Sequence, residues 1–278
     1  MNPKRTIPFY HVDAFTDIPF SGNPAAVCLM KCDLDDAAYL SISSEMNLSE
    51  TAFLEPTETQ GHYHLRWFTP KVEVPLCGHA TLASAHVIFR HLRTGVKKIV
   101  FQTKSGELRA VRRGQGVQLD FPSNDTSRID PPAAMMKALQ VKEWRDARYS
   151  KEAGKLLIRL RDSDEVRQLQ PDFAGLLASP DPLGVKGIIV TAEGQTPYDF
   201  VSRYFAPWVG INEDPVTGSA HTVLAPYWAH ELGKDEMRAY QVSSRGGELL
   251  VKIGRQRVYI SGKAVTIIKG RMKPPTMS

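Results

Sequence analysis

The stretch RWFTPKVEVPLCGHA, residues 66–80, decides the fold because it occurs twice in the chain. Residues 203–220 read RYFAPWVGINEDPVTGSA. Both copies give Arg, an aromatic residue, Phe, a small residue and Pro. After a short loop, both continue with Glu-x-Pro-x-[Cys/Thr]-Gly-[His/Ser]-Ala. The copies lie about half the chain apart, a spacing too long for a solenoid repeat. The repetition therefore predicts a duplicated domain, with two similar lobes that each carry one copy.

The sequence around each copy predicts what such a lobe contains. Short alternating runs of apolar and polar residues are typical of strands. One apolar, alanine-rich helix follows each copy, at residues 79–92 and 219–232. Strand-rich halves with one buried helix each predict an α+β fold, in which a sheet wraps around a central helix. Residues 122–132, rich in Pro, Ser and Asp, form the best linker. We therefore expect lobes at residues 1–123 and 124–278, with the final strand packing back on the first lobe.

Charge and composition argue against several classes of partner. The 278 residues carry 35 Lys and Arg against 30 Asp and Glu, a net charge of +5. The basic residues are dispersed rather than clustered, which argues against a nucleic-acid surface. A mildly basic protein suits a small anionic substrate. No apolar run approaches 18 residues, so we expect no membrane span.

The three cysteines, Cys28, Cys32 and Cys77, indicate a reducing compartment. Their odd number and wide spacing argue against a disulfide framework, and Cys28-x-x-x-Cys32 has no second pair to complete a zinc site. The N-terminal residues lack the apolar region of a signal peptide. We therefore expect a cytoplasmic protein without a metal.

The two Gly-[His/Ser]-Ala turns are the first candidate site. Gly78 and Gly218 would each precede the first turn of a buried helix, where N–H groups are unpaired and the helix dipole adds positive charge. Together with Ser219, two such helix starts could bind a carboxylate. Either turn alone is more simply explained as an ordinary glycine turn before a core helix.

The residues before each glycine, Cys77 and Thr217, bear on the type of catalysis. Two cysteines at these positions would suit a racemase that uses one thiol on each face of its substrate. A threonine hydroxyl is too weak an acid and base to replace a thiol, so symmetric racemisation is disfavoured. Cys77 could instead be a small apolar residue beneath the site.

Three further residues could transfer or hold a proton. His79 occupies the place that Ser219 has in the second copy, and it could bind a carboxylate or relay a proton. Asp214 precedes Thr217 by three residues and could orient His79 or a substrate amine. Glu45 lies near the end of a helix predicted over residues 35–46, where the negative end of the dipole would raise its pKa. Each has a simpler interpretation: a buried histidine, a helix cap and a surface glutamate.

Several motifs spread over nearly the whole chain resemble the PhzF-like family, which is named for an isomerase of phenazine biosynthesis. They are GNPAAV (22–27), EMNLSETAF (45–53), RWFTPKVEVPLCGHATLASA (66–85), YDFVSRYFAP (198–207) and EDPVTGSAH (213–221). The resemblance implies the diaminopimelate epimerase-like fold, with two pseudo-symmetric lobes and the active site between them. It also implies a homodimer that uses no cofactor.

The resemblance assigns roles to the candidate residues. It places the glutamate that shuttles a proton along the substrate skeleton at Glu45. It places the remaining site residues at Gly78, His79, Asp214, Gly218 and Ser219. Cys77 departs from the phenazine enzyme, so the class of chemistry carries over better than the substrate. We therefore expect a cofactor-free, biosynthetic-type isomerase.

Two alternatives remain at this point. One is a non-enzymatic protein of the same fold that binds a small molecule or a protein. The other is an epimerase that uses Cys77 and a non-thiol partner. A serine hydrolase is disfavoured because Ser219 lies in Thr-Gly-Ser-Ala rather than in a Gly-x-Ser-x-Gly elbow.

Overall fold

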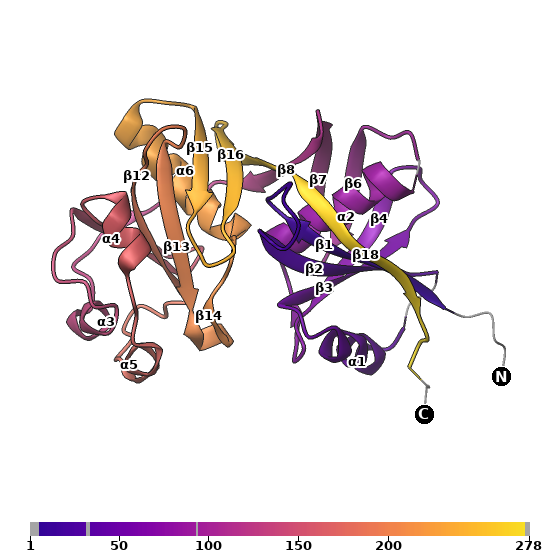
Figure 1. Cartoon of the computed structure of the whole chain (residues 1–278), viewed down its shortest axis with the longest axis horizontal. Coiled ribbons are helices and arrows are strands. Elements are labelled where there is room, and N and C mark those ends of the chain that lie inside the picture. Colours follow the sequence, from indigo (N-terminus) through magenta and orange to yellow (C-terminus); the bar gives the residue numbers. More distant parts are fainter. Residues whose placement is uncertain (1–5, 32–33, 93, 276–278) are drawn as a thin grey trace. The chain divides into compact units, whose positions relative to one another are not determined.

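The structure, a computed structural model, describes residues 6–31, 34–92 and 94–275, so Cys32 lies outside it. The chain forms two compact units (Figure 1). Unit 1 comprises Met1–Asp120 and Ser261–Ser278, and unit 2 comprises Phe121–Ile260. The sequence places the boundary at residue 123, and the contacts place it after Asp120. Within the described residues, no helix is long and apolar enough to cross a membrane.

Unit 1 is a strongly curved sheet. Its strands pair in the order β18-β1-β2-β3-β4-β6-β7-β8, with β5 on the end of β4. The β2–β3 and β4–β6 pairs are parallel and the others are antiparallel. The strand bounds are β1 Ile7–Ala14, β2 Asn23–Leu29, β3 Glu50–Pro56, β4 His62–Phe68, β5 Glu73–Val74, β6 Lys98–Thr103, β7 Gly106–Arg113, β8 Gly116–Pro122 and β18 Ala264–Met272.

Two helices cover the two faces of this sheet. Helix α2 (Gly78–His91) is buried at every position from Gly78 to Ile88 and packs on β1, β2 and β3. Helix α1 (Asp36–Met46) begins at Asp35, whose carboxylate accepts from the Ala38 N–H at 2.7 Å. The apolar face of α1 packs through Tyr39 on Phe53 of β3. The central helix that the repeat predicts is therefore α2.

Unit 2 is built on a further run of paired strands, with β14 on the end of β13. Its strands pair in the order β9-β10-β11-β12-β13-β15-β16, and the β11–β12 and β13–β15 pairs are parallel. The strand bounds are β9 Ser127–Arg128, β10 Asp146–Ser150, β11 Lys155–Arg159, β12 Gly187–Glu193, β13 Phe200–Ala206, β14 Ile211–Glu213, β15 Glu236–Gln241, β16 Gly247–Ile253 and β17 Arg257–Gly262.

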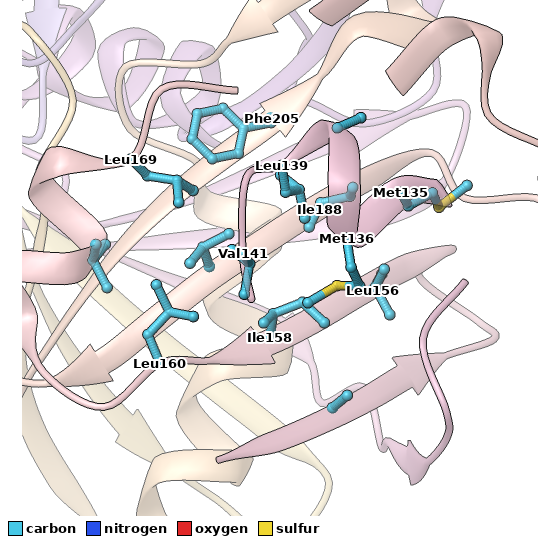
Figure 2. Close-up of a cluster of buried hydrophobic side chains, with 14 of the residues drawn as sticks. Met135, Met136, Leu139, Val141, Leu156, Ile158, Leu160, Leu169, Ile188 and Phe205 are labelled. Atoms are coloured by element: carbon cyan, nitrogen blue, oxygen red, sulfur yellow. The ribbon is translucent and has the colours of Figure 1, made fainter. Parts of the chain in front are cut away.

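Helix α6 (Gly218–Leu232) is the buried helix of unit 2 and packs on β15 and β16. The short helices α3 (Ala133–Ala138), α4 (Ser163–Gln168) and α5 (Phe173–Ala178) supply the rest of the core. Figure 2 shows how Met135, Met136 and Leu139 meet the strand residues Leu156 and Ile158. The 3-10 turn η1 (Pro207–Val209) leads from β13 to β14.

The two units repeat one pairing scheme. In unit 1 the run is β2-β3-β4-β6-β7, and in unit 2 it is β11-β12-β13-β15-β16. Parallel and antiparallel pairs alternate in the same way in both runs. A buried helix follows the short strand β5 or β14 in each unit. The predicted α+β fold with two similar lobes is confirmed.

Candidate active site

The repeated Arg and Glu residues form the same ion pair in both units. Arg66 donates to Glu73 through Nε and Nη2, at 2.9 Å each. Arg203 donates to Glu213 through the same two nitrogens, at 2.7 and 2.9 Å. Two parallel hydrogen bonds between a guanidinium and a carboxylate fix both partners in geometry as well as in charge. The pair fastens the loop after β4 or β13, and this loop leads into the buried helix.

Each helix start is thereby held at a defined place. The residues before the helices, Cys77 and Thr217, have extended backbone, and neither caps its helix through its side chain. Gly78 and Gly218 are the first residues of α2 and α6 and are buried, whereas Ser219 is half-buried. The first N–H groups of an uncapped helix remain available to an anion or to water.

A cluster of polar side chains lies at the start of α2. Glu50 Oε2 is 3.3 Å from His79 Nε2, and Ser49 Oγ is 3.3 Å from the same nitrogen. Cys77 Sγ is 3.5 Å from His79 Nδ1. The Glu50 side chain is only 14% exposed and that of His79 only 6%. We call Ser49, Glu50, Cys77 and His79 the Glu50 cluster.

Burial raises the pKa of Glu50 above its ordinary value, because the charged carboxylate has lost most of its contact with water. Hydrogen bonds from Ser49 and Cys77 lower the pKa in part, since they favour the ionised form. A carboxylate with a raised pKa is a stronger base than an ordinary carboxylate, which suits proton transfer. The Glu50 cluster therefore has the character of a general acid/base site.

The structure does not bring Glu45 into this cluster. Glu45 is exposed near the end of α1, whose buried residues are Ala38, Tyr39, Ile42 and Ser43. The helix ends at Asn47, which takes the left-handed conformation with φ of 49°. The chain then turns and enters β3 at Glu50. Of the two glutamates in EMNLSE, the one that contacts His79 is the second.

Strand alternation carries a signal for Glu50 that the sequence interpretation missed. Phe53 faces α1, where it packs against Tyr39. Because successive side chains point to opposite faces, Glu50, Ala52 and Leu54 share the other face, on which α2 packs. A glutamate on the same strand face as two fully buried apolar residues is expected to be buried rather than exposed at the surface.

The second copy builds a different polar group in unit 2. The Thr217 hydroxyl donates to Asp214 Oδ2, and Asp214 is 8% exposed. The fully buried Gln241 of β15 accepts from the Thr217 N–H at 2.9 Å and donates to the Asp214 carbonyl at 2.6 Å. Gln241 thus fixes the turn that carries Asp214, and the sequence patterns did not single it out.

The sequence-predicted residues therefore fall into two groups. Unit 1 brings together Cys77, Gly78 and His79, and unit 2 brings together Asp214, Thr217, Gly218 and Ser219. The ligand atoms of Glu50, Cys77 and His79 lie within 4.8 Å of one another, so these three side chains could also hold a divalent metal.

Comparison with known proteins places this geometry in context. Residues 12–270 match the family described as "Phenazine biosynthesis-like protein". The mouse phenazine biosynthesis-like domain-containing protein 1 is 47% identical over 96% of this chain and 99% of its own length. An uncharacterized isomerase of Halalkalibacterium halodurans is 45% identical over 96% and 98%.

Solved structures give the same picture. A PhzF family protein of Enterococcus faecalis has a TM-score of 0.90 at 41% identity, over 97% of this chain and 100% of that one. More distant structures, among them a hydroxyproline epimerase at 13% identity, share the fold alone. The similarity extends over both units, and so over both copies of the repeated motif.

Proposed function

Since the chain belongs to the phenazine biosynthesis-like (PhzF) family, we propose that it is a cofactor-independent isomerase that moves a proton between two carbons of a small carboxylate-bearing molecule. The observation that carries the proposal is Glu50, a nearly buried carboxylate 3.3 Å from His79 at the head of α2. A relative whose name includes "isomerase" supports the same class of reaction.

In the proposed reaction, Glu50 is the single acid/base group. Its carboxylate takes a proton from a carbon next to an unsaturated group, and the electron pair of the C–H bond moves into that group. The protonated Glu50 then gives the proton to a second carbon of the same molecule, so Glu50 ends in its starting state. The raised pKa suits this role because it makes the carboxylate a stronger base than an ordinary glutamate. We assign this role to Glu50 rather than to Glu45.

The geometry of the cluster favours a proton shift over epimerisation. A two-base epimerase needs its acid and its base on opposite faces of one carbon. Glu50 and Cys77 have their reactive atoms within 4.8 Å of each other and belong to one cluster, so they serve the same face. Thr217, the counterpart of Cys77 in unit 2, has no thiol.

The remaining residues hold the substrate. His79 contacts Glu50 through Nε2 and can polarise the group that receives the electron pair. N–H groups at the start of α2, which carries His79, suit the substrate carboxylate.

Hydrogen exchange tests this proposal across many candidate substrates at once. The protein is incubated in heavy water with a panel of unsaturated, cyclic and amino-substituted carboxylic acids, with EDTA present because the reaction needs no metal. Mass spectrometry then measures deuterium uptake. We expect one structural class to gain deuterium at carbon.

Glu50→Gln and Glu45→Gln form a matched pair, since each replaces one glutamate of the same motif. We expect Glu50→Gln to slow exchange by about 100- to 10,000-fold, the usual contribution of a general acid/base. We expect Glu45→Gln to retain exchange within about twofold. Wild-type exchange in Glu50→Gln, or loss in Glu45→Gln alone, would contradict the assignment. Ligands that bind without exchange in the wild-type protein would favour a binding protein.

A further inference from the structure

The Glu50 cluster offers three kinds of metal ligand in addition to a base. Cys77 supplies a sulfur, His79 an imidazole nitrogen and Glu50 a carboxylate oxygen, and one ligand atom from each lies within 4.8 Å of the other two. Cys77 immediately precedes α2, His79 lies in the first turn of this helix, and Glu50 is the first residue of β3. All three ligands therefore come from unit 1.

The distances within the cluster are close to those between the ligands of one zinc ion. Tetrahedral zinc binds sulfur at about 2.3 Å and nitrogen or oxygen at about 2.0–2.2 Å, so its ligand atoms lie about 3.3–3.7 Å apart. Cys77 Sγ is 3.5 Å from His79 Nδ1, and Glu50 Oε2 is 3.3 Å from His79 Nε2. Each of the two contacts therefore already has the length of an edge of the tetrahedron.

Only a small movement would bring the three ligands onto one ion. The two contacts use different nitrogens of His79, and a single zinc ion binds one of them. Because no pair of the three ligand atoms is more than 4.8 Å apart, the longest separation has to shorten by about 1 Å. The Glu50 side chain has three rotatable bonds and can make this movement. It is also 14% exposed, so the cluster meets solvent on that side.

The types of ligand select the metal. A thiolate and an imidazole together suit zinc, whereas magnesium and calcium are bound through oxygen ligands. Three protein ligands leave one position of the tetrahedron for a water molecule or for the Ser49 hydroxyl, which is 3.3 Å from His79 Nε2. The cluster therefore has the composition of a zinc site rather than of a site for a hard cation.

We propose that Cys77, His79 and Glu50 bind zinc, and that zinc inhibits the protein by occupying the carboxylate that the reaction needs. The inhibition rests on the proposed function, whereas the binding does not. On binding, the Cys77 thiol releases its proton to solvent and its sulfur coordinates the ion. A Glu50 carboxylate that coordinates zinc through its lone pair cannot take a proton from carbon. Zinc and substrate therefore compete for the same group.

Cobalt spectroscopy measures metal binding to the cluster without any substrate. Reduced protein is freed of metal with EDTA, desalted and titrated with Co²⁺, which accepts the same ligands as zinc and absorbs visible light. We expect a single equivalent of Co²⁺ to give a thiolate-to-cobalt band in the near ultraviolet and the strong visible bands of a tetrahedral site. Zn²⁺ should then displace Co²⁺, because such sites bind zinc more tightly. Absence of the thiolate band would overturn the proposal.

Substitutions identify the ligands. Cys77→Ser keeps the size of the side chain but should abolish the thiolate band. His79→Gln and Glu50→Gln should each weaken Co²⁺ binding by at least about 100-fold, since loss of a ligand costs more than loss of a group that only orients one. Cys28→Ala and Cys32→Ala are the matched controls for the other two thiols and should keep the band. A band that persists in Cys77→Ser, or an unchanged affinity in Glu50→Gln, would overturn the site.

Deuterium exchange tests the inhibition. With a compound that exchanges, Zn²⁺ added in place of EDTA should slow exchange by about 100- to 10,000-fold, as much as Glu50→Gln does. Excess EDTA should restore the rate, and Cys77→Ser should lose the sensitivity to zinc relative to its own metal-free rate. Exchange that is unaffected at a zinc concentration that displaces Co²⁺ would overturn the inhibition. If no compound exchanges, the proposed reaction fails, whereas the cobalt spectra still decide the metal site.

Discussion

Replacing Lys155 with methionine should change how the stability of the protein depends on pH. The folded pKa of about 8 lies below the unfolded value of 10.5. Below pH 8 the ammonium is charged in both states, and its burial cost is fully present. Between pH 8 and 10.5 the unfolded chain binds one more proton than the folded chain. Stability must then rise with pH in this window, by about 1.4 kcal/mol per unit at most.

The size of the effect follows from the two pKa values. A difference of about 2.5 units corresponds to about 3 kcal/mol, since one unit is worth about 1.36 kcal/mol. The methionine variant lacks this contribution. The free energy of unfolding of Lys155→Met minus that of wild type should therefore fall by about 3 kcal/mol between pH 7 and 10.5. Comparing the two proteins at each pH cancels the titration of all other groups.

Urea unfolding followed by circular dichroism at half-unit steps of pH measures this difference. Lys151→Met is the matched control, because Lys151 is an exposed lysine four residues earlier in the chain. Its difference from wild type should stay flat across the window. A flat difference for Lys155→Met, or one that rises with pH, would refute the idea that Lys155 is a buried ammonium with a depressed pKa.

Three further outcomes are expected. Exchange at limiting substrate should rise with pH through a midpoint above the ordinary glutamate value, because Glu50 must be ionised to act as a base, and a pH profile of the rate measures this. Cys77→Ala should keep exchange within about tenfold, because Glu50 carries the proton, whereas complete loss would support the one-cysteine epimerase. Arg203→Met should destabilise unit 2 by about 3–5 kcal/mol in urea unfolding. The substitution leaves Glu213 without its partner and removes the 2.6 Å hydrogen bond to the Leu169 carbonyl. A change below about 1 kcal/mol would contradict the role of the ion pair.

The duplication was predictable from sequence because the repeated residues make the same contacts in both units. Arg66 with Glu73, and Arg203 with Glu213, must keep their identity to form the same two-bond ion pair. Gly78 and Gly218 are the first residues of the buried helix in each unit. Repeated contacts leave repeated letters, so two similar lobes follow from the sequence pattern alone.

The sequence alone does not distinguish the two glutamates of the motif EMNLSE. An argument from the helix dipole favours Glu45, which ends on the exposed side of α1. The turn at Asn47, together with the sheet face on which β3 presents Glu50, determines which of the two glutamates contacts His79. That face is set by α2, far along the chain, so local sequence patterns could not reveal it without the strand register.

Gln241 and Lys155 were not predicted, for a related reason. Both act through neighbours that are distant in sequence: Gln241 through Asp214 and Thr217, and Lys155 through Tyr204. A single polar residue in a strand looks the same whether it faces water or a buried partner. Only the pairing of β13 with β12 and β15 distinguishes these cases.

The place of β18 has a consequence for how the protein is made. Residues 264–272 pair along the whole length of β1, at the other end of the chain. Unit 2 is continuous in sequence, from Phe121 to Ile260, and all of it leaves the ribosome before β18 does. The unit that is synthesised first is therefore the last to be completed. Until β18 emerges, β1 lacks its outer neighbour in the sheet. A nascent chain that ends before β18 therefore leaves the N-terminal half of the protein incomplete, rather than the C-terminal half.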